Sequence, residues 1–264
     1  MKLNVFAFIS YLRFLRKSGS RHSVHSPFVY TLIDEVLKNS TKYPEFAEIS
    51  ELRHSLSKNS QVIEITDFGT GRNLADFSHR FESIATILRN SAINEKYGHI
   101  LFRLVNYFKP ATIVELGTSI GISTLYMAKA NPDARVYTVE GCTTKSERAT
   151  SNFNILKASN IEQHIGRFDI VLPDLIAEVK KLDFAFIDGN HTYEATLANF
   201  EALLEISHND TIFVFDDIHW SAGMEKAWNE IVDHKRITVS VDLYRMGIVF
   251  LRSELSRQKF IIRF

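Results

Sequence analysis

The sequence predicts an α/β protein built on a doubly wound sheet, with a mostly helical extension before it. From Ala111 onward, short apolar runs alternate with helical patterns, which is typical of strand–helix–strand units in a parallel sheet. Residues 1–90 instead place apolar residues at the three- and four-residue spacing of helices. Near the C-terminus, two strand patterns separated by a tight turn indicate an antiparallel pair. We therefore expect a helical extension over residues 1–90 and one α/β domain over residues 91–264.

The individual elements follow from the same patterns. Before Ala111, helices are expected at residues 3–17, 27–39, 44–57 and 95–108. Ser26 is a suitable N-cap for the second of these, because Pro27 then takes the first helical position. Buried strands are expected at residues 112–116, 135–139, 161–165, 184–187 and 211–215. Helices are expected between and after them, near residues 121–130, 143–157, 168–180, 191–205 and 221–233. The final pair covers residues 237–244 and 247–251 with its turn at Arg245-Met246, and residues 259–264 add a further strand.

Composition narrows the class of protein. The 31 Lys and Arg residues balance the 31 Asp and Glu residues, so no overall field attracts nucleic acid, and no nucleic-acid partner is expected. The single cysteine, Cys142, excludes an internal disulfide framework and favours a reducing compartment. We therefore expect a cytoplasmic protein.

The N-terminal segment is apolar but short. Arg13, Arg16 and Lys17 follow its apolar residues at once, and no small-x-small cleavage site is present. An amphipathic helix, docked on the protein or lying on a membrane surface, is therefore favoured over a signal peptide. No apolar run is long enough to span a bilayer, so no transmembrane segment is expected.

The main candidate for a ligand site is the turn from Glu115 to Gly121, which follows the first predicted strand and precedes a helix. Ligands of open α/β sheets bind beyond the carboxyl ends of the strands. Gly117 permits a tight turn, and Gly121 permits close packing of the helix start. The spacing is G-x-x-x-G and not G-x-G-x-x-G, so a cofactor without a pyrophosphate is favoured. A strand-to-helix turn without a ligand is the alternative.

Two acids extend this candidate site. Glu115 stands just before Gly117, where it could balance the charge of a ligand's ammonium group. Glu140 ends the second predicted strand, where a carboxylate can accept hydrogen bonds from both hydroxyls of a ribose. A nucleoside-containing ligand is therefore expected.

Further acids end two later strands. Asp188 follows the strand at residues 184–187, and Asp216 and Asp217 follow the strand at residues 211–215. In a parallel sheet these ends meet at one edge, where three carboxylates would repel one another without a cation, and Mg²⁺ suits such oxygen ligands. His191 lies near enough to Asp188 to serve as a base. The alternatives are helix capping by Asp188, one solvent-facing acid, and a structural His191.

The sequence leaves the roles of two further segments undecided. The turn at residues 66–72 offers a second G-x-G pattern, but no clear strand and acid follow it, so we interpret it as a turn. His219 and Trp220, after the tandem acids, are candidates for the wall of an acceptor pocket; a plain loop is the alternative.

Over residues 91–252 the sequence resembles class I S-adenosylmethionine-dependent methyltransferases. Within that class it is similar to the catechol O-methyltransferase-like group and its uncharacterised bacterial relatives. The resemblance implies a Rossmann-like sheet of seven strands with a reversed final hairpin. The segment His25–Tyr30 is also similar to the N-terminal part of such bacterial proteins, and that similarity implies no known chemistry.

The resemblance assigns roles residue by residue. It implies cofactor contacts along the loop and at the following helix, a ribose contact, an adenine region after the third strand, and Asp188; these residues are Glu115, Gly117, Thr118, Ser119, Gly121, Ser123, Glu140, Gly166, Arg167, Phe168 and Asp188. It also implies metal ligation by Asp188, Asp216 and Asp217. The catechol-type base is a lysine, whose place His191 takes here, and the family's Gly-Asp near the adenine is Gly166-Arg167. Residues 91–98 match the helix that leads into the family's domain only loosely.

These observations predict an O-methyltransferase with S-adenosylmethionine as methyl donor, a small-molecule acceptor, and Mg²⁺ assistance. Asp188 and His191 would be its catalytic residues, and the N-terminal helices would cap the acceptor pocket or form a homodimer contact. The alternatives are a metal-free methyltransferase on another nucleophile and a cofactor-binding regulator without turnover. A dehydrogenase is disfavoured by the glycine spacing and by the final hairpin.

Overall fold

The computed structural model describes residues 5–20, 24–67 and 78–264. The chain divides into two compact units, which are described separately. Unit 1 comprises residues 1–39 and 179–264, and unit 2 comprises residues 40–178. The predicted boundary between residues 90 and 91 therefore remains a prediction about how the chain is organised.

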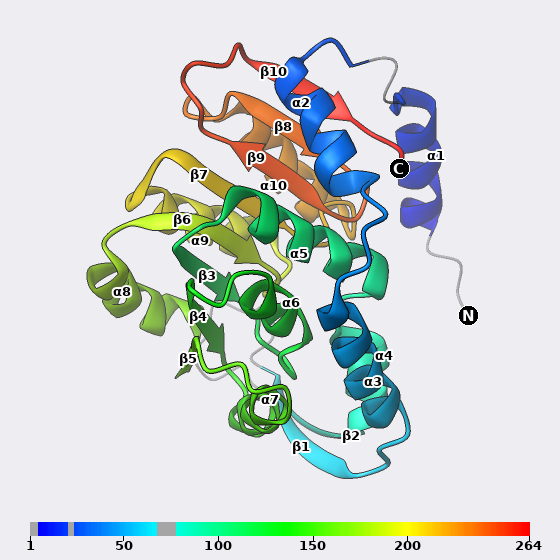
Figure 1. Cartoon of the computed structure of the whole chain (residues 1–264), viewed down its shortest axis with the longest axis vertical. Helices are drawn as coiled ribbons and strands as arrows, with labels where there is room; N and C mark the ends of the chain where they lie inside the picture. Colours follow the sequence, from blue (N-terminus) through cyan, green and yellow to red (C-terminus); the bar gives the residue numbers. More distant parts are fainter. Residues whose placement is uncertain (1–4, 21–23, 68–77) are drawn as a thin grey trace. The chain divides into compact units, whose positions relative to one another are not determined.

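Unit 2 holds the first half of the α/β pattern (Figure 1). Its parallel strands, each followed by a helix, are β3 (Thr112–Leu116), β4 (Arg135–Glu140) and β5 (Ile161–Ile165). The helices are α6 (Ile122–Ala130), α7 (Thr143–Ile155) and α8 (Phe168–Val179). Strands and helices match the ranges that the sequence predicts within two residues. Strands β3 and β4 are largely buried runs rich in β-branched residues, whereas β5, which was expected to be buried, is partly exposed.

The remaining elements among the described residues of unit 2 are three helices and a hairpin. They are α3 (Pro44–Ser57), β1 (Val62–Asp67), β2 (Ser78–Ser83), α4 (Ile84–Ser91) and α5 (Glu95–Phe108). The antiparallel β1–β2 hairpin and α4 were not predicted from the sequence. Strand β2 is largely exposed, so it lacks the alternation of apolar and polar residues that marks a half-buried strand. Most of the predicted turn at residues 66–72 lies outside the described residues.

Unit 1 holds the second half of the pattern. Strands β6 (Leu182–Ile187) and β7 (Ser207–Phe215) are parallel, and helices α9 (Tyr193–Leu204) and α10 (Ala222–Asp233) follow them. Strand β9 (Gly247–Phe250) runs antiparallel to both β7 and β8 (Val239–Asp242), and β10 (Gln258–Ile261) runs parallel to β8. The reversed final hairpin is therefore confirmed, and with it the predicted α/β Rossmann-like class of the fold.

The core of unit 1 is aromatic. Phe200 of α9 packs edge-to-face against Phe213 of β7, and Phe215 lies close to Trp228 of α10. A β-carbon on Gly247 would lie 2.5 Å from the Trp228 ring, so this strand start must be glycine. Each buried phenylalanine contributes about 2 kcal/mol through the burial of apolar surface, so this packing fixes β7 and its acidic end.

The N-terminal part of unit 1 contains α1 (Val5–Lys17), α2 (Pro27–Leu32) and a π-helical turn (Ile33–Leu37). The Ser26 hydroxyl accepts a hydrogen bond from the Val29 amide, so the predicted N-cap is confirmed. No helix in the described ranges is long and apolar enough to cross a membrane.

Candidate active site

The loop between β3 and α6 in unit 2 depends on its glycines. Gly117 (φ 110°) and Gly121 (φ 81°) both adopt left-handed backbone conformations. A β-carbon on Gly121 would lie 2.4 Å from the Phe153 ring of α7, so no side chain fits there. The Gly117 amide donates to the Val139 carbonyl at 2.9 Å, which ties the loop to the end of β4. The two glycines therefore bring the loop close to the neighbouring strand, as their spacing predicted.

Glu140, at the end of β4, holds the tip of this loop. One carboxylate oxygen accepts the Ser119 amide at 2.7 Å, and the other accepts the Cys142 amide at 2.9 Å. Ser119 has a φ of 48°, a conformation that a non-glycine residue adopts only where its surroundings hold it. Its hydroxyl is buried and has no hydrogen-bond partner in the protein. Buried hydroxyls are normally paired, so this one is available to a ligand.

Glu115 has no solvent-exposed surface. Its carboxylate accepts hydrogen bonds from the hydroxyls of Ser123, Thr124 and Thr138, each at 2.5 Å. Burial raises the pKa of the Glu115 carboxyl above its ordinary value, against the opposite effect of the three hydroxyls. The predicted interaction of this carboxylate with a ligand's ammonium group stays a prediction; in the structure its hydrogen bonds with Ser123 and Thr124 hold the start of α6.

The segment after β5 carries the predicted adenine region. Gly166 has a φ of 152°, and a β-carbon there would lie 2.7 Å from the Val171 side chain. Its amide donates to the Glu140 carbonyl at 2.9 Å, which places it beside the ribose candidate. Arg167 pairs with Asp169 through two contacts of 3.0 Å, so its charge is already compensated. Phe168 begins α8 and is partly exposed.

In unit 1, two neighbouring strands end in acids. Ile187 of β6 pairs with Phe215 of β7, so Asp188 and Asp216 follow strand ends at the same level of the sheet. Asp216 is 1% exposed, whereas Asp188 and Asp217 are partly exposed. Asp217 has a φ of 53°, which turns the chain away from β7. The structure therefore brings the predicted acids to one edge of β6 and β7.

The sequence analysis missed Arg245, which contacts two of these acids. Its guanidinium lies 3.2 Å from Asp216 and 3.2 Å from Asp217. Burial and, to a smaller extent, the charge of Asp217 raise the pKa of Asp216, and Arg245 acts in the opposite direction, so that the pKa is about 6. The signal was present in the sequence: a strand antiparallel to β7 must begin where β7 ends, so the turn before Gly247 had to face the acids.

His191 lies near Asp188, as predicted. Its Nε2 atom is 3.5 Å from an Asp188 carboxylate oxygen. Burial lowers the pKa of the His191 imidazole and Arg245 lowers it further, while Asp217 acts in the opposite direction. A lowered pKa favours the neutral imidazole, which can accept a proton.

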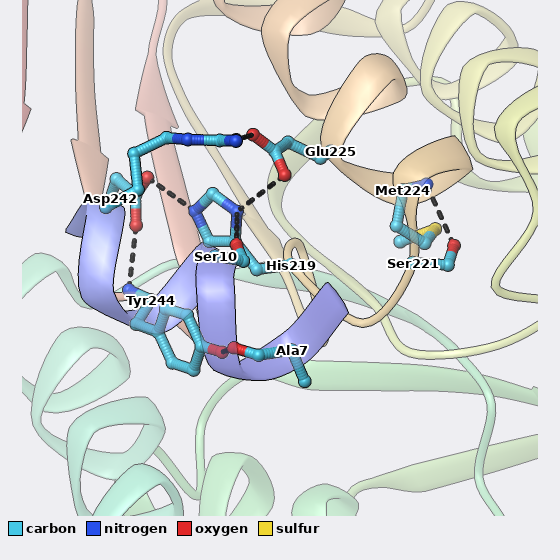
Figure 2. A network of polar contacts seen from close by, with 9 residues as sticks. Ala7, Ser10, His219, Ser221, Met224, Glu225, Asp242 and Tyr244 are labelled. Atoms are coloured by element: carbon cyan, nitrogen blue, oxygen red, sulfur yellow. Dashed lines mark hydrogen bonds and ion pairs between the residues drawn. The ribbon is translucent and has the colours of Figure 1, made fainter. Parts of the chain in front are cut away.

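His219 belongs to a polar network (Figure 2). Its Nε2 atom lies 2.8 Å from Asp242, its Nδ1 atom lies 3.4 Å from the Ser10 hydroxyl, and its ring stacks on Tyr244. Trp220 is 62% exposed. His219 thus joins α1 to the β8–β9 hairpin, and its predicted part in an acceptor pocket stays a prediction.

The predicted residues therefore fall into two groups. The loop, ribose and adenine candidates gather in unit 2, and the acids and His191 gather in unit 1. Asp188, which was also predicted to contact the cofactor, belongs to unit 1.

Comparison with known proteins gives one family. Residues 114–218 match a family model described as a methyltransferase domain. A probable O-methyltransferase of Mycobacterium tuberculosis is 29% identical over 171 residues, which cover 54% of this chain and 68% of that protein. An uncharacterized protein of Acanthamoeba polyphaga mimivirus is 31% identical over 147 residues, which cover 51% of this chain and 66% of that protein. The chain thus spans about two thirds of the length of these relatives.

Solved structures share the fold at low identity. The O-methyltransferase TomG from Streptomyces achromogenes, involved in tomaymycin synthesis and solved with S-adenosylmethionine, has a TM-score of 0.58 and 18% identity, over 85% of this chain and 95% of that one. An O-methyltransferase from Bacillus cereus, solved with S-adenosylhomocysteine, has a TM-score of 0.56 and 19% identity, over 84% of this chain and 97% of that one.

Proposed function

We propose that this chain, which belongs to the class I S-adenosylmethionine-dependent methyltransferases, transfers a methyl group to an oxygen of a small-molecule acceptor. The proposal takes its substrate class from the named O-methyltransferases to which the chain is similar. The balanced charge of the chain gives no reason to expect a nucleic-acid acceptor. The predicted cytoplasmic location and homodimer belong to the same proposal.

The cofactor half of the proposal rests on the unpartnered Ser119 hydroxyl. It is a buried polar group inside a glycine loop, beside a carboxylate at a strand end, and a nucleoside ligand would satisfy it. Residues 117–121 would hold the amino-acid part of S-adenosylmethionine, Glu140 the ribose hydroxyls, and residues 166–168 the adenine. When bound, the cofactor supplies an electrophilic methyl group on a sulfonium.

On the acceptor side, His191 is the proposed base that takes the proton of the acceptor hydroxyl. Its neutral imidazole accepts the proton of the acceptor hydroxyl as that oxygen becomes a nucleophile. Asp188, 3.5 Å away, orients the imidazole and stabilises its protonated form. Much of the rate would come from holding the acceptor oxygen in line with the methyl group.

The residues predicted to hold Mg²⁺ already have a cation beside them. The metal's donors would be Asp188, Asp216 and Asp217, but a guanidinium already compensates Asp216 and Asp217. This donor set fits a divalent cation poorly, and we assign no step of the reaction to a metal.

Thermal unfolding with S-adenosylhomocysteine tests the cofactor half. Ligand at 100 times its dissociation constant should stabilise the protein by about 2.7 kcal/mol. The Ser119→Ala variant should keep the stability of the free wild-type protein, because the hydroxyl has no partner to lose, yet it should bind about tenfold more weakly. Ser57→Ala, which removes an exposed hydroxyl, is the matched control. An unchanged melting temperature with S-adenosylhomocysteine and an increase with NAD would contradict the proposal.

His191→Gln tests the acceptor half. It keeps a polar side chain but cannot accept the proton, so the methylation rate should fall about 100-fold or more while cofactor affinity stays unchanged. An unchanged rate would remove His191 from the reaction.

A further inference from the structure

Arg245 stands in the turn between β8 and β9, at a place set by the reversed hairpin. Because Gly247 of β9 pairs with Phe215 of β7, this turn must lie beside the end of β7. The Arg245 carbonyl accepts the Ile218 amide at 3.2 Å, so its backbone is fixed to the loop that carries the tandem acids. The position of Arg245 is thus part of the fold of unit 1.

The guanidinium reaches three carboxylate oxygens. Its Nη2 atom lies 3.2 Å from one oxygen of Asp216, and its Nε atom lies 3.4 Å from the other. The same Nε atom is 3.2 Å from Asp217. Burial acts to lower the pKa of Arg245, but Asp216, Asp217 and Asp188 outweigh it and raise that pKa. The guanidinium therefore stays charged against these acids at any ordinary pH.

We propose that Arg245 supplies to Asp216 and Asp217 the positive charge that a divalent cation would otherwise supply, so that methyl transfer by this protein needs no added metal. This inference rests on the proposed function for its reaction, but the charge compensation itself concerns unit 1 alone. A metal ion on the same carboxylates would have to displace the guanidinium or bind next to a like charge.

Ligand spacing supports this inference. In the described parts of the chain, the group whose candidate ligand atoms lie within 4.8 Å of one another consists of Glu162, His164 and Glu178, in unit 2. Asp188, Asp216 and Asp217 do not form such a group. Arg135 pairs with Glu162, so that group also has a guanidinium beside it.

Manganese binding, followed by the electron paramagnetic resonance signal of free Mn²⁺, tests the inference without an activity assay. A Glu162→Gln background removes the competing group in unit 2. In that background the wild-type unit 1 should bind no Mn²⁺ at micromolar concentrations. Arg245→Gln leaves two acids uncompensated and should bind Mn²⁺ at least about tenfold more tightly. Adding Asp216→Asn and Asp217→Asn should remove the gained binding.

Two results would overturn this inference. The first is that the Glu162→Gln protein binds stoichiometric Mn²⁺ and that Asp216→Asn with Asp217→Asn abolishes this binding. The second is that EDTA stops methylation and Mg²⁺ restores it. If Arg245→Gln does not fold, Arg245→Lys keeps the charge without the two-pronged geometry, and it should bind no Mn²⁺. Failure of the proposed function would look different, since S-adenosylhomocysteine would not shift the melting temperature while the Mn²⁺ results stayed the same.

A separate observation concerns helix α1, whose inner face is held to the rest of unit 1 (Figure 2). The Tyr244 hydroxyl donates to the Ala7 carbonyl at 2.9 Å, and the Tyr11 ring packs edge-on against Tyr244. Arg13 pairs with Glu225 at 2.9 Å. The chain after the helix pairs with the C-terminal strand, as the Gly19 amide donates to the Ile261 carbonyl at 2.8 Å. Helix α1 is therefore a fixed part of unit 1.

The outer face of α1 is apolar. Phe8, Ile9 and Leu12, at helical spacing, are 54%, 49% and 50% exposed. Arg16 and Lys17, in the last turn, are exposed next to this stripe. Large apolar side chains gathered on one exposed face indicate an interaction surface.

The charges on and near α1 indicate what binds this surface. Residues 1–33 contain no Asp or Glu, although the whole chain has as many acidic as basic residues. Their basic residues are Lys2, Arg13, Arg16, Lys17 and Arg21. We infer that the outer face of α1 docks on the surface of an anionic lipid bilayer, with its apolar stripe in the headgroup region and its basic end on the lipid charges. A second copy fits less well, because two α1 helices would bring like charges together without an acid between them.

Sedimentation with lipid vesicles tests this second inference. The protein should bind vesicles of phosphatidylcholine with phosphatidylglycerol and should not bind phosphatidylcholine alone. Phe8→Ser with Leu12→Ser, and separately Arg16→Glu with Lys17→Glu, should each weaken binding about tenfold or more. Ile170→Ser, at an exposed apolar residue in unit 2, is the matched control and should bind as the wild type does. Absence of binding to the vesicles that contain phosphatidylglycerol would overturn the inference, as would a dimer in analytical ultracentrifugation that Phe8→Ser with Leu12→Ser dissociates.

Discussion

Each unit contains a buried carboxylate, and the two are compensated in different ways. In unit 2, three hydroxyl groups hold Glu115. In unit 1, a guanidinium holds Asp216. Burial raises the pKa of both carboxyls. A hydroxyl can donate a hydrogen bond to a carboxylate or accept one from a protonated carboxyl group. A guanidinium can only donate, so it favours the carboxylate. The difference indicates a carboxyl that shapes a loop in unit 2 and an ion pair in unit 1 whose guanidinium stays charged.

Removal of the guanidinium should have the largest effect on stability. Arg245→Met leaves Asp216 buried without its partner, and such a loss costs about 3 kcal/mol or more of unfolding free energy. Arg245→Met combined with Asp216→Asn should recover more than half of this loss, since no charge is then buried. Urea unfolding of the single and double variants measures both values.

Lys259→Met is the control for that comparison. Lys259 pairs with Asp233 at 2.6 Å, but both side chains are exposed, so its loss should cost less than about 1 kcal/mol. Equal losses of unfolding free energy for Arg245→Met and Lys259→Met would show that the buried pair of Arg245 and Asp216 stabilises the fold no more than an exposed pair does.

The corresponding change in unit 2 should act on the ligand more than on the fold. Glu140→Ala removes the acceptor of the Ser119 and Cys142 amides and the proposed ribose contact. Affinity for S-adenosylhomocysteine should fall about 100-fold, which corresponds to about 2.7 kcal/mol. Isothermal titration calorimetry measures this fall, and Glu140→Gln, which keeps one acceptor oxygen, should lie between the alanine variant and the wild type. Wild-type affinity in Glu140→Ala would place the ribose elsewhere.

The two units also differ in what the sequence could predict. The loop of unit 2 could be predicted because its determinants are local: Gly117 and Gly121 lie within one turn, and Glu140 ends the next strand. Arg245 was missed because it acts on acids 28 and 29 residues earlier, through the pairing of β7 with β9. The sequence analysis predicted only the pairing of the last two strands with each other. The hydroxyl partners of Glu115 were missed for another reason, since a strand pattern shows that a residue is buried but not which hydroxyls face it.

More of the fold than of the candidate site could be predicted from the sequence. Buried strands such as β3 and β7 are apolar runs that carry their own signal, whereas β2 is an exposed strand whose partner alone defines it. The π-helical turn at Ile33–Leu37 has the apolar spacing of an ordinary helix, so the sequence gives no reason to expect it. Elements that bury their own side chains are thus predictable, and elements that other parts of the chain define are not.

A pH series on Glu115→Gln should show the smallest and most specific effect. Because burial raises the folded-state pKa of Glu115 above its ordinary value of 4.5, the protonated carboxyl favours the folded state. That contribution is complete below the ordinary value and is lost as pH rises through the raised one. Glutamine cannot titrate, so the stability of the variant relative to the wild type should increase as pH rises from 4 to 8. Urea unfolding at each pH, with Glu162→Gln at a partly exposed carboxylate as control, measures the difference. A constant difference between variant and wild type would mean that the three hydroxyls fully compensate the buried charge, and the contrast with Asp216 would then disappear.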